Sequence, residues 1–118
     1  MFGIKRRQSD ILYSKYLRKK RNYICEKCGR YFPEGLGLQV SHFYTRKYES
    51  VRFDEENTDI LCFADHMFFE QNPAHYAEWK QKRMTKRAYK ILMVRAHTLK
   101  KKDDKLILLF LKQQMKKP

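Results

Sequence analysis

The chain has 118 residues, which is enough for one compact domain and too few for two ordinary ones. Lys and Arg outnumber Asp and Glu by 27 to 13, so the formal net charge is +14 and favours a polyanionic partner such as nucleic acid or an acidic membrane surface. Aromatic residues make up 14% of the chain, so the composition excludes a disordered basic tail and predicts a folded domain.

The charge is distributed unevenly along the chain. Residues 1–30 carry ten basic and two acidic side chains, residues 31–79 carry three and nine, and residues 80–118 carry fourteen and two. Two basic flanks therefore enclose an acidic centre. An acidic segment in a basic protein is a place where a cation can bind, although a solvated loop explains it equally well.

No segment of the sequence has the pattern of a signal peptide or a membrane span. The most apolar run, Leu106 to Leu111, is far shorter than the roughly 20 residues that a spanning helix needs. We therefore expect a protein of the cytoplasm of whatever cell makes it, with no membrane partner.

The hydrophobic pattern predicts an α+β domain. Helices are expected at residues 8–20, from near 65 to before 73, from 73 to about 83, at 85–98 and at 104–115, and short strands at 38–44 and 59–62. Pro73 suits the first position of a helix, and Asn72 is its expected cap. The last helix is apolar on most sides, so we expect it to fill the core, with a homodimer interface as the alternative.

The three cysteines indicate a metal site. Cys25 and Cys28 form a Cys-x-x-Cys-Gly knuckle, in which a tight turn directs two thiolates at one point. Cys62 supplies a third thiolate for a structural zinc ion. Asp65 and His66 are both candidates for the fourth ligand, because zinc accepts carboxylate oxygen as well as imidazole nitrogen. The alternative is that Cys62 is only a small buried hydrophobic residue.

A second set of polar residues carries a family resemblance. Ser41, His42 and Asn57 lie between Cys28 and Cys62, and His66 follows Cys62. The segment from Asn57 to His66 resembles the second half of an HNH endonuclease motif. More narrowly, several short motifs are similar to those of the phage NinG (Rap) recombination nucleases: Ser41-His42-Phe, Arg52-Phe53-x-x-x-Asn57, Cys62 and Gln71-Asn72-x-x-x-Tyr76. The resemblance covers roughly residues 23–79. Residues 1–22 and 80–118 are then expected to be basic flanking helices of a single domain, 1–118.

The resemblance implies a zinc-stapled ββα-metal fold, in which two antiparallel strands and a helix hold a catalytic Mg²⁺ or Mn²⁺ ion. It implies that His42 is the general base, that Asn57 orients the loop or reaches the metal, and that His66 binds the cation. Glu70 and Asn72 are further candidate ligands of that cation. We assign Asp65 to zinc and His66 to the catalytic cation, because adjacent helical residues point about 100° apart.

The family pattern often has an Asp directly before the catalytic histidine, where this chain has Ser41. The cation is then expected to bind more weakly, or to rely on Asn57, Asn72 or Glu70. His42 as a hydrogen-bonded core histidine and Asn72 as a simple cap are the corresponding structural alternatives.

The function that the resemblance implies is metal-dependent hydrolysis of phosphodiester bonds in DNA, by a phage recombination nuclease that acts on branched or junction DNA. The basic side chains expected to contact the phosphate backbone are Arg46, Arg52, Lys80, Arg83 and Arg87. One alternative is a non-catalytic zinc-knuckle DNA-binding protein with structural histidines. Another is an RNA-directed nuclease or binder, because phosphate contacts do not identify the sugar.

Overall fold

The computed structural model describes residues 6–98 and 104–116. Its helices are α1 (Gln8–Lys20), α2 (Phe63–Gln71), α3 (Pro73–Arg83), α4 (Lys86–Ala96) and α5 (Asp104–Met115), and its strands are β1 (Leu38–His42) and β2 (Thr58–Cys62). Two short 3₁₀ helices, η1 (Pro33–Gly35) and η2 (Glu49–Val51), lie in the connections. The described chain is thus a small α+β domain, and the predicted helices 8–20, 73–83 and 104–115 have the predicted bounds.

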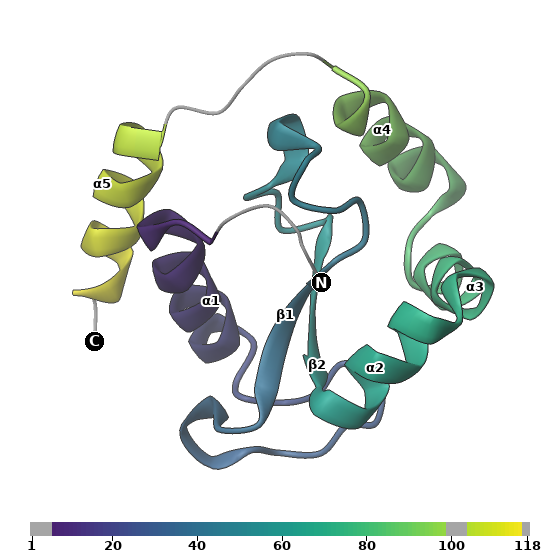
Figure 1. Cartoon of the computed structure of the whole chain (residues 1–118), viewed down its shortest axis with the longest axis horizontal. Helices are drawn as coiled ribbons and strands as arrows, with labels where there is room; N and C mark the ends of the chain where they lie inside the picture. The colour runs from purple at the N-terminus through teal and green to yellow at the C-terminus, as the bar shows by residue number, and fades with distance from the viewer. Residues whose placement is uncertain (1–5, 99–103, 117–118) are drawn as a thin grey trace.

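The two strands form an antiparallel sheet in which Leu38 lies opposite Cys62 and His42 lies opposite Thr58. In Figure 1 this hairpin lies between two groups of helices, with α1 and α5 side by side on one side and α2, α3 and α4 in an arc on the other. β1 ends two residues earlier than predicted. The reason is that the N–H of Tyr44 donates to the side-chain Oδ1 of Asn57 at 2.8 Å, not to a strand carbonyl.

The main hydrophobic core joins the sheet to helices on both sides of it. Its fully or almost fully buried members include Leu17 of α1, Ile60 and Leu61 of β2, Phe69 of α2 and Leu111 of α5. Burial of one such side chain contributes about 1.5–3 kcal/mol. A smaller cluster of Val51, Leu92 and Ala96 attaches α4 to η2, so the loop between the strands has its own anchor.

Helix α5 fills the core with one face only. Leu111 is buried against α1, whereas Leu106, Leu109 and Phe110 are exposed. The core interpretation of this helix is therefore correct for one face, and the homodimer stays a prediction for the other. None of the helices in residues 6–98 and 104–116 is long and apolar enough to span a bilayer.

Candidate metal centre and histidine site

Three cysteines and one aspartate meet where β2 passes into α2. Cys25 and Cys28 come from the turn that follows α1, Cys62 is the last residue of β2, and Asp65 lies in the first turn of α2. One ligand atom of each lies within 4.8 Å of the other three. Gly29 closes the knuckle because it adopts a φ of +76°, and its N–H donates to the carbonyl of Cys25 at 2.8 Å.

The donor set fits a zinc ion. Oδ2 of Asp65 lies 3.2 Å from Sγ of Cys25 and 3.3 Å from Sγ of Cys62, so thiols donate to the carboxylate. The backbone N–H of Cys62 points at Sγ of Cys25 at 3.4 Å, a contact that stabilises a thiolate. Three thiolates and a carboxylate are ligands that zinc accepts. The cluster can therefore hold a metal ion, and Asp65, not His66, is its fourth member.

The protonation of this cluster depends on whether a cation is bound. Burial raises the pKa of the Cys25 thiol to about 12 and raises the pKa of Cys62 in the same direction. Burial also opposes ionisation of Asp65, but hydrogen bonds from the thiols and the charge of Lys27 outweigh it and lower the pKa of that carboxyl. A divalent cation deprotonates coordinating thiols. Metal binding here is therefore expected to release protons.

His42 lies at the end of β1, and its ring is held by a backbone carbonyl. Nε2 is 2.9 Å from the carbonyl oxygen of Arg52. A carbonyl only accepts, so Nε2 carries the proton and Nδ1 carries the lone pair. Burial, assisted by the positive charge of Arg46, lowers the pKa of His42 to about 4. The imidazole is therefore neutral at pH 7.

Asn57 shapes the loop between the two strands. Its side chain is fully buried, accepts from the N–H of Tyr44, and donates to the carbonyls of Tyr44 at 2.9 Å and Val51 at 3.1 Å. Of the two roles that the resemblance implies, these contacts correspond to orienting the loop. Because the amide is buried, it is not accessible to a cation in this structure, which corrects the expectation that it reaches the metal.

The residues of α2 and its C-cap that are expected to bind a catalytic cation do not form a preformed site. Nδ1 of His66 contacts Oε1 of Gln39 at 2.6 Å, and the Asn72 amide donates to the carbonyl of Phe68 at 2.8 Å. Glu70 is exposed. Within residues 6–98 and 104–116, the cysteine–aspartate cluster is the only group of three or more His, Cys, Asp or Glu side chains close enough to share an ion.

Asn72 also departs from its expected capping role. It occupies the N-cap position of α3, but its side chain makes no capping hydrogen bond to that helix. The amide instead bonds back to the last turn of α2, and Pro73 supplies the helix start.

His42 and the hydrogen-bond partner of His66 point to opposite faces of β1. Gln39, the partner of His66, is three residues before His42 on β1, and side chains three apart on a strand point to opposite faces. In the described part of the chain no hydrogen bond joins the two rings. Arg46 is close enough to both that its charge lowers the pKa of each, although burial is the larger cause in both cases. This places the Arg46 guanidinium within electrostatic reach of both histidines.

Two of the five cations expected to contact DNA lie in the interior. The Arg52 side chain is 0% exposed, and its guanidinium bonds to Asp10 at 2.6 and 3.0 Å. Lys80 is 3% exposed and donates to Oδ1 of Asp59 at 2.8 Å. A nucleic acid strand cannot reach either side chain in this structure, so the expectation for these two residues is corrected.

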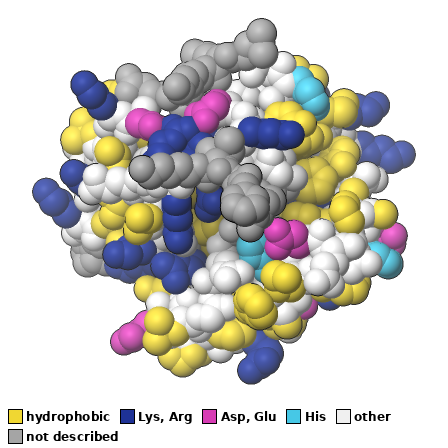
Figure 2. All heavy atoms as spheres, in the orientation of Figure 1, with side chains coloured by type: hydrophobic (Ala, Val, Ile, Leu, Met, Phe, Trp, Pro, Cys, Tyr) yellow, Lys and Arg dark blue, Asp and Glu magenta, His cyan; other side chains and the backbone are white. Residues whose placement is uncertain are grey.

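The other three cations remain available at the surface to different degrees. Arg46 is half-buried, and its Nε lies 3.6 Å from Oδ1 of Asp10. Arg83 is exposed, packs 4.6 Å from the centroid of the Trp79 ring and pairs with Glu26 at 2.8 Å. Arg87 is exposed on α4. Figure 2 shows Lys and Arg side chains densest over the side of α1 and α5, with a second group over the side of α4.

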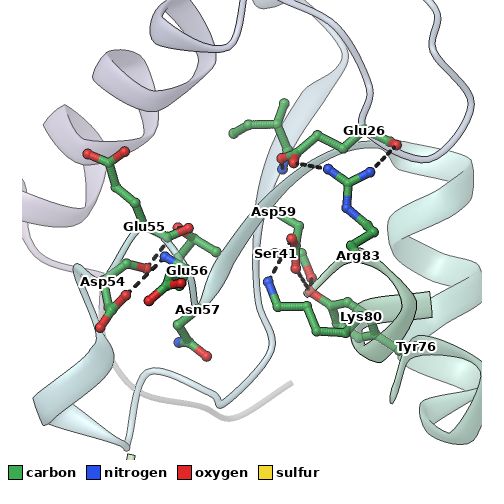
Figure 3. Close-up of polar contacts among 12 residues, drawn as sticks. Glu26, Ser41, Asp54, Glu55, Glu56, Asn57, Asp59, Tyr76, Lys80 and Arg83 are labelled. Atoms are coloured by element: carbon green, nitrogen blue, oxygen red, sulfur yellow. Dashed lines mark hydrogen bonds and ion pairs between the residues drawn. The ribbon is translucent and has the colours of Figure 1, made fainter. Parts of the chain in front are cut away.

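Sequence reasoning missed a buried polar cluster around Asp59. Tyr76 donates to Oδ2 of Asp59 at 2.6 Å, and Oγ of Ser41 lies 2.9 Å from the Tyr76 hydroxyl. Figure 3 shows Tyr76 and Lys80 of α3 gathered around Asp59. The signal was the i, i+4 spacing of Tyr76 and Lys80, which puts both on one helix face. Ser41 thus has a structural partner at the position where the family pattern often has a metal-binding Asp.

A polar cavity of about 210 Å³ opens beside this cluster. Its lining includes Glu26, Asp59, Lys80 and Arg83, whose charges pair with one another. Neither His42 nor His66 lines it. The cavity therefore does not form part of the histidine site.

Comparison with protein-family models finds no family that matches this chain. No curated protein and no solved structure matches it either. What the chain does must therefore be inferred from the residues and contacts of these two sites.

Proposed function

We propose that this chain is a metal-dependent DNA endonuclease of the HNH type, stapled by a structural zinc ion. The observation that carries the proposal is the state of His42. Its ring is neutral, its Nε2 proton is held by the Arg52 carbonyl, and its Nδ1 keeps a lone pair. Phosphodiester hydrolysis requires a base that removes a proton from the attacking water. Burial makes this imidazole a weaker base than a free one, so what supports the role is its fixed orientation and the lone pair on Nδ1.

The zinc ion belongs to the cluster of Cys25, Cys28, Cys62 and Asp65. Four protein ligands close the coordination of zinc and leave no open position for a substrate, which is typical of a structural site. By joining the turn after α1 to the junction of β2 and α2, the ion would fix the helix that carries His66.

A second divalent cation, Mg²⁺ or Mn²⁺, would polarise the scissile phosphate and neutralise its developing charge when bound. His66 and Glu70 are the residues that we propose to hold it, because they lie one turn apart on α2 and Glu70 is exposed. Arg46 is proposed to hold the phosphate, since a guanidinium matches two phosphate oxygens. The resemblance to NinG nucleases makes branched DNA the proposed substrate and the cytoplasm the proposed location.

The proposal is tested by cleavage assays on plasmid and branched DNA with Mg²⁺ or Mn²⁺. The His42→Ala variant is expected to lose about 10²- to 10⁴-fold in cleavage rate while it still binds DNA. His75→Ala is the matched control, because His75 is an exposed histidine of α3 outside the site. A wild-type protein that cuts neither DNA nor RNA with any divalent cation would contradict the proposal.

A second candidate function is non-catalytic DNA binding through a zinc knuckle. It is favoured by the fact that both histidines already have protein partners, the Arg52 carbonyl and Gln39. The same assays separate the two functions. Tight DNA binding without cleavage, unchanged in the His42→Ala variant, would favour this candidate. Cleavage of RNA but not DNA would instead favour the RNA-directed nuclease.

A further inference from the structure

A buried ion-pair network lies beneath the loop that precedes β2. The Arg52 guanidinium bonds to both carboxylate oxygens of Asp10, Nη2 to Oδ2 at 2.6 Å and Nε to Oδ1 at 3.0 Å. Its Nη1 lies 3.1 Å from Oε2 of Glu49. Arg7 pairs with Glu49 and with Asp104 of α5. The network thus connects the start of α1, the 3₁₀ helix η2 and the start of α5.

The backbone of Arg52 connects this ion-pair network to His42. The carbonyl oxygen of Arg52 accepts the Nε2 proton of His42 at 2.9 Å. The N–H of Arg52 donates to the carbonyl of Glu49 at 3.2 Å, so the backbone on the other side of this residue is also fixed. The side chain of Arg52 is therefore held by carboxylates, and its carbonyl oxygen is hydrogen-bonded to His42, the candidate base.

The energetics favour a geometric role for this ion pair. A buried Arg–carboxylate pair loses the hydration of both charges, and a well-packed apolar pair of similar volume is often at least as stable. What a two-point Arg–carboxylate contact provides beyond an apolar pair is a fixed orientation. The ring of His42 is hydrogen-bonded to the carbonyl of this fixed residue, so the orientation of Arg52 affects it directly.

We propose that Arg52 and Asp10 are positioning residues for His42: their buried ion pair holds the Arg52 carbonyl against Nε2 and so keeps the imidazole in the tautomer with its lone pair on Nδ1. Glu49 of η2 accepts a further hydrogen bond from the Arg52 guanidinium. The inference rests on the proposed function, in which Nδ1 of His42 takes the proton from water. It assigns Arg52 to the interior of the site and not to the DNA surface.

The test measures the tautomer of His42 directly. The full chain, loaded with zinc, is labelled with ¹⁵N-histidine, and two-bond ¹H–¹⁵N correlation spectra show which ring nitrogen carries the proton. Comparison with His42→Gln assigns the signals among the four histidines. Arg52→Lys and Asp10→Asn are the main variants. Glu49→Gln is a milder one, because the Glu49 side chain is 26% exposed.

Asp59→Asn is the matched control. Asp59 is also a buried carboxylate in an ion pair, but its partners Lys80 and Tyr76 make no hydrogen bond to His42. We expect the wild type and Asp59→Asn to keep His42 wholly in the Nε2–H form. Arg52→Lys and Asp10→Asn should give a mixture of tautomers and lower the cleavage rate about 10- to 100-fold, the cost typical of losing a residue that orients a metal-binding histidine. DNA affinity should not change.

Two results would overturn the proposal. One is a wild-type His42 that carries its proton on Nδ1, and the other is a single Nε2–H tautomer in folded Arg52→Lys and Asp10→Asn proteins. If neither buried variant folds, an unshifted tautomer in Glu49→Gln overturns it. If the tautomer shifts as expected but the wild type cuts no nucleic acid, the positioning role is supported and the nuclease proposal fails.

Discussion

The cysteine cluster and the histidine site both include residues of α2, but they are built in opposite ways. In the cluster the candidate ligands are one another's polar partners, and Asp65 receives hydrogen bonds from two of the thiols. In the histidine site each ring is held separately, His42 by a carbonyl and His66 by Gln39. The cluster needs only an ion to complete it. The two histidines share no ligand or hydrogen bond in the described chain, so a site that used both would depend on a bound cation and substrate.

This difference predicts that the two sites respond to different perturbations. Losing a cluster ligand should remove a cross-link between segments that are distant in the sequence and therefore lower the stability of the fold. Losing a histidine should cost less stability than losing a cluster ligand, because each ring makes only one hydrogen bond among the described residues, to the Arg52 carbonyl or to Gln39, and joins no set of shared ligands.

The largest effect is expected from Cys28→Ser or from removal of the metal by a chelator. Cys28 is exposed, so its substitution removes a ligand without opening a cavity in the core. We expect the free energy of unfolding to fall by more than about 3 kcal/mol, because metal-binding energy in such sites is folding energy. Thermal unfolding followed by circular dichroism, with elemental analysis of zinc, measures this. An equally stable, zinc-free Cys28→Ser protein would contradict a structural metal.

A sharper test of the cluster exchanges its fourth ligand. Asp65→Ala should weaken zinc binding, whereas Asp65→Cys should restore four ligands and retain about one zinc ion per chain. His66→Ala is the matched control, because His66 contacts Gln39 and does not belong to the cluster. Competition with a chromogenic chelator ranks the three affinities. Zinc loss in His66→Ala but not in Asp65→Ala would reverse the assignment.

The same contrast explains what the sequence could predict. The cluster was predictable because Cys25 and Cys28, and Cys62 and Asp65, are each three residues apart, and a turn or helix start fixes their relative direction. The buried state of Arg52 was not predictable, because its partner Asp10 is 42 residues away in the sequence. A basic side chain has the same local pattern whether its partner is a protein carboxylate or a phosphate.

The bounds of the helices and of β1 show the same difference between local and distant determinants. The apolar spacing and flanking residues of α1, α3 and α5 are local signals, and their bounds were predicted correctly. The end of β1 depends on the Asn57 side chain, which returns from the far end of the loop to take the N–H of Tyr44. The loop between β1 and β2, whose Arg52 carbonyl bonds to His42, therefore has no hydrophobic periodicity from which its structure could be predicted.

The third prediction concerns the pH dependence of stability. The pKa of His42 is lowered to about 4 in the folded chain, mainly by burial, from an ordinary value near 6.5. The unfolded chain therefore binds a proton first as the pH falls, and stability is lost between about pH 6.5 and pH 4. Going from pH 7.5 to pH 5 should cost the wild type about 2 kcal/mol more than it costs His42→Gln.

The Gln variant is a suitable reference because its side chain keeps an N–H donor for the Arg52 carbonyl but does not titrate in this range. The charged groups that face His42 are Asp10, Arg46 and Arg52, and all remain in both proteins, as does the cysteine cluster. Urea unfolding at both pH values measures the difference. Parallel loss of stability in the two proteins would show that His42 is not buried in its neutral form.

The smallest effect is expected from substitution of single cations near the surface, and it tests which of the two sites contacts DNA. Arg46 lies within electrostatic reach of both histidines, whereas Arg30 is an exposed residue of the cysteine knuckle whose carbonyl accepts from Cys25. If the strand crosses the histidine site, Arg46→Ala should lower the slope of log affinity against log salt by about 1, and Arg30→Ala should leave it unchanged. Fluorescence anisotropy across a salt series measures both slopes. A larger decrease of this slope in Arg30→Ala than in Arg46→Ala would place the DNA on the cysteine knuckle. That result would favour the non-catalytic function, because the strand would then lie at the candidate structural metal site and not at the histidines.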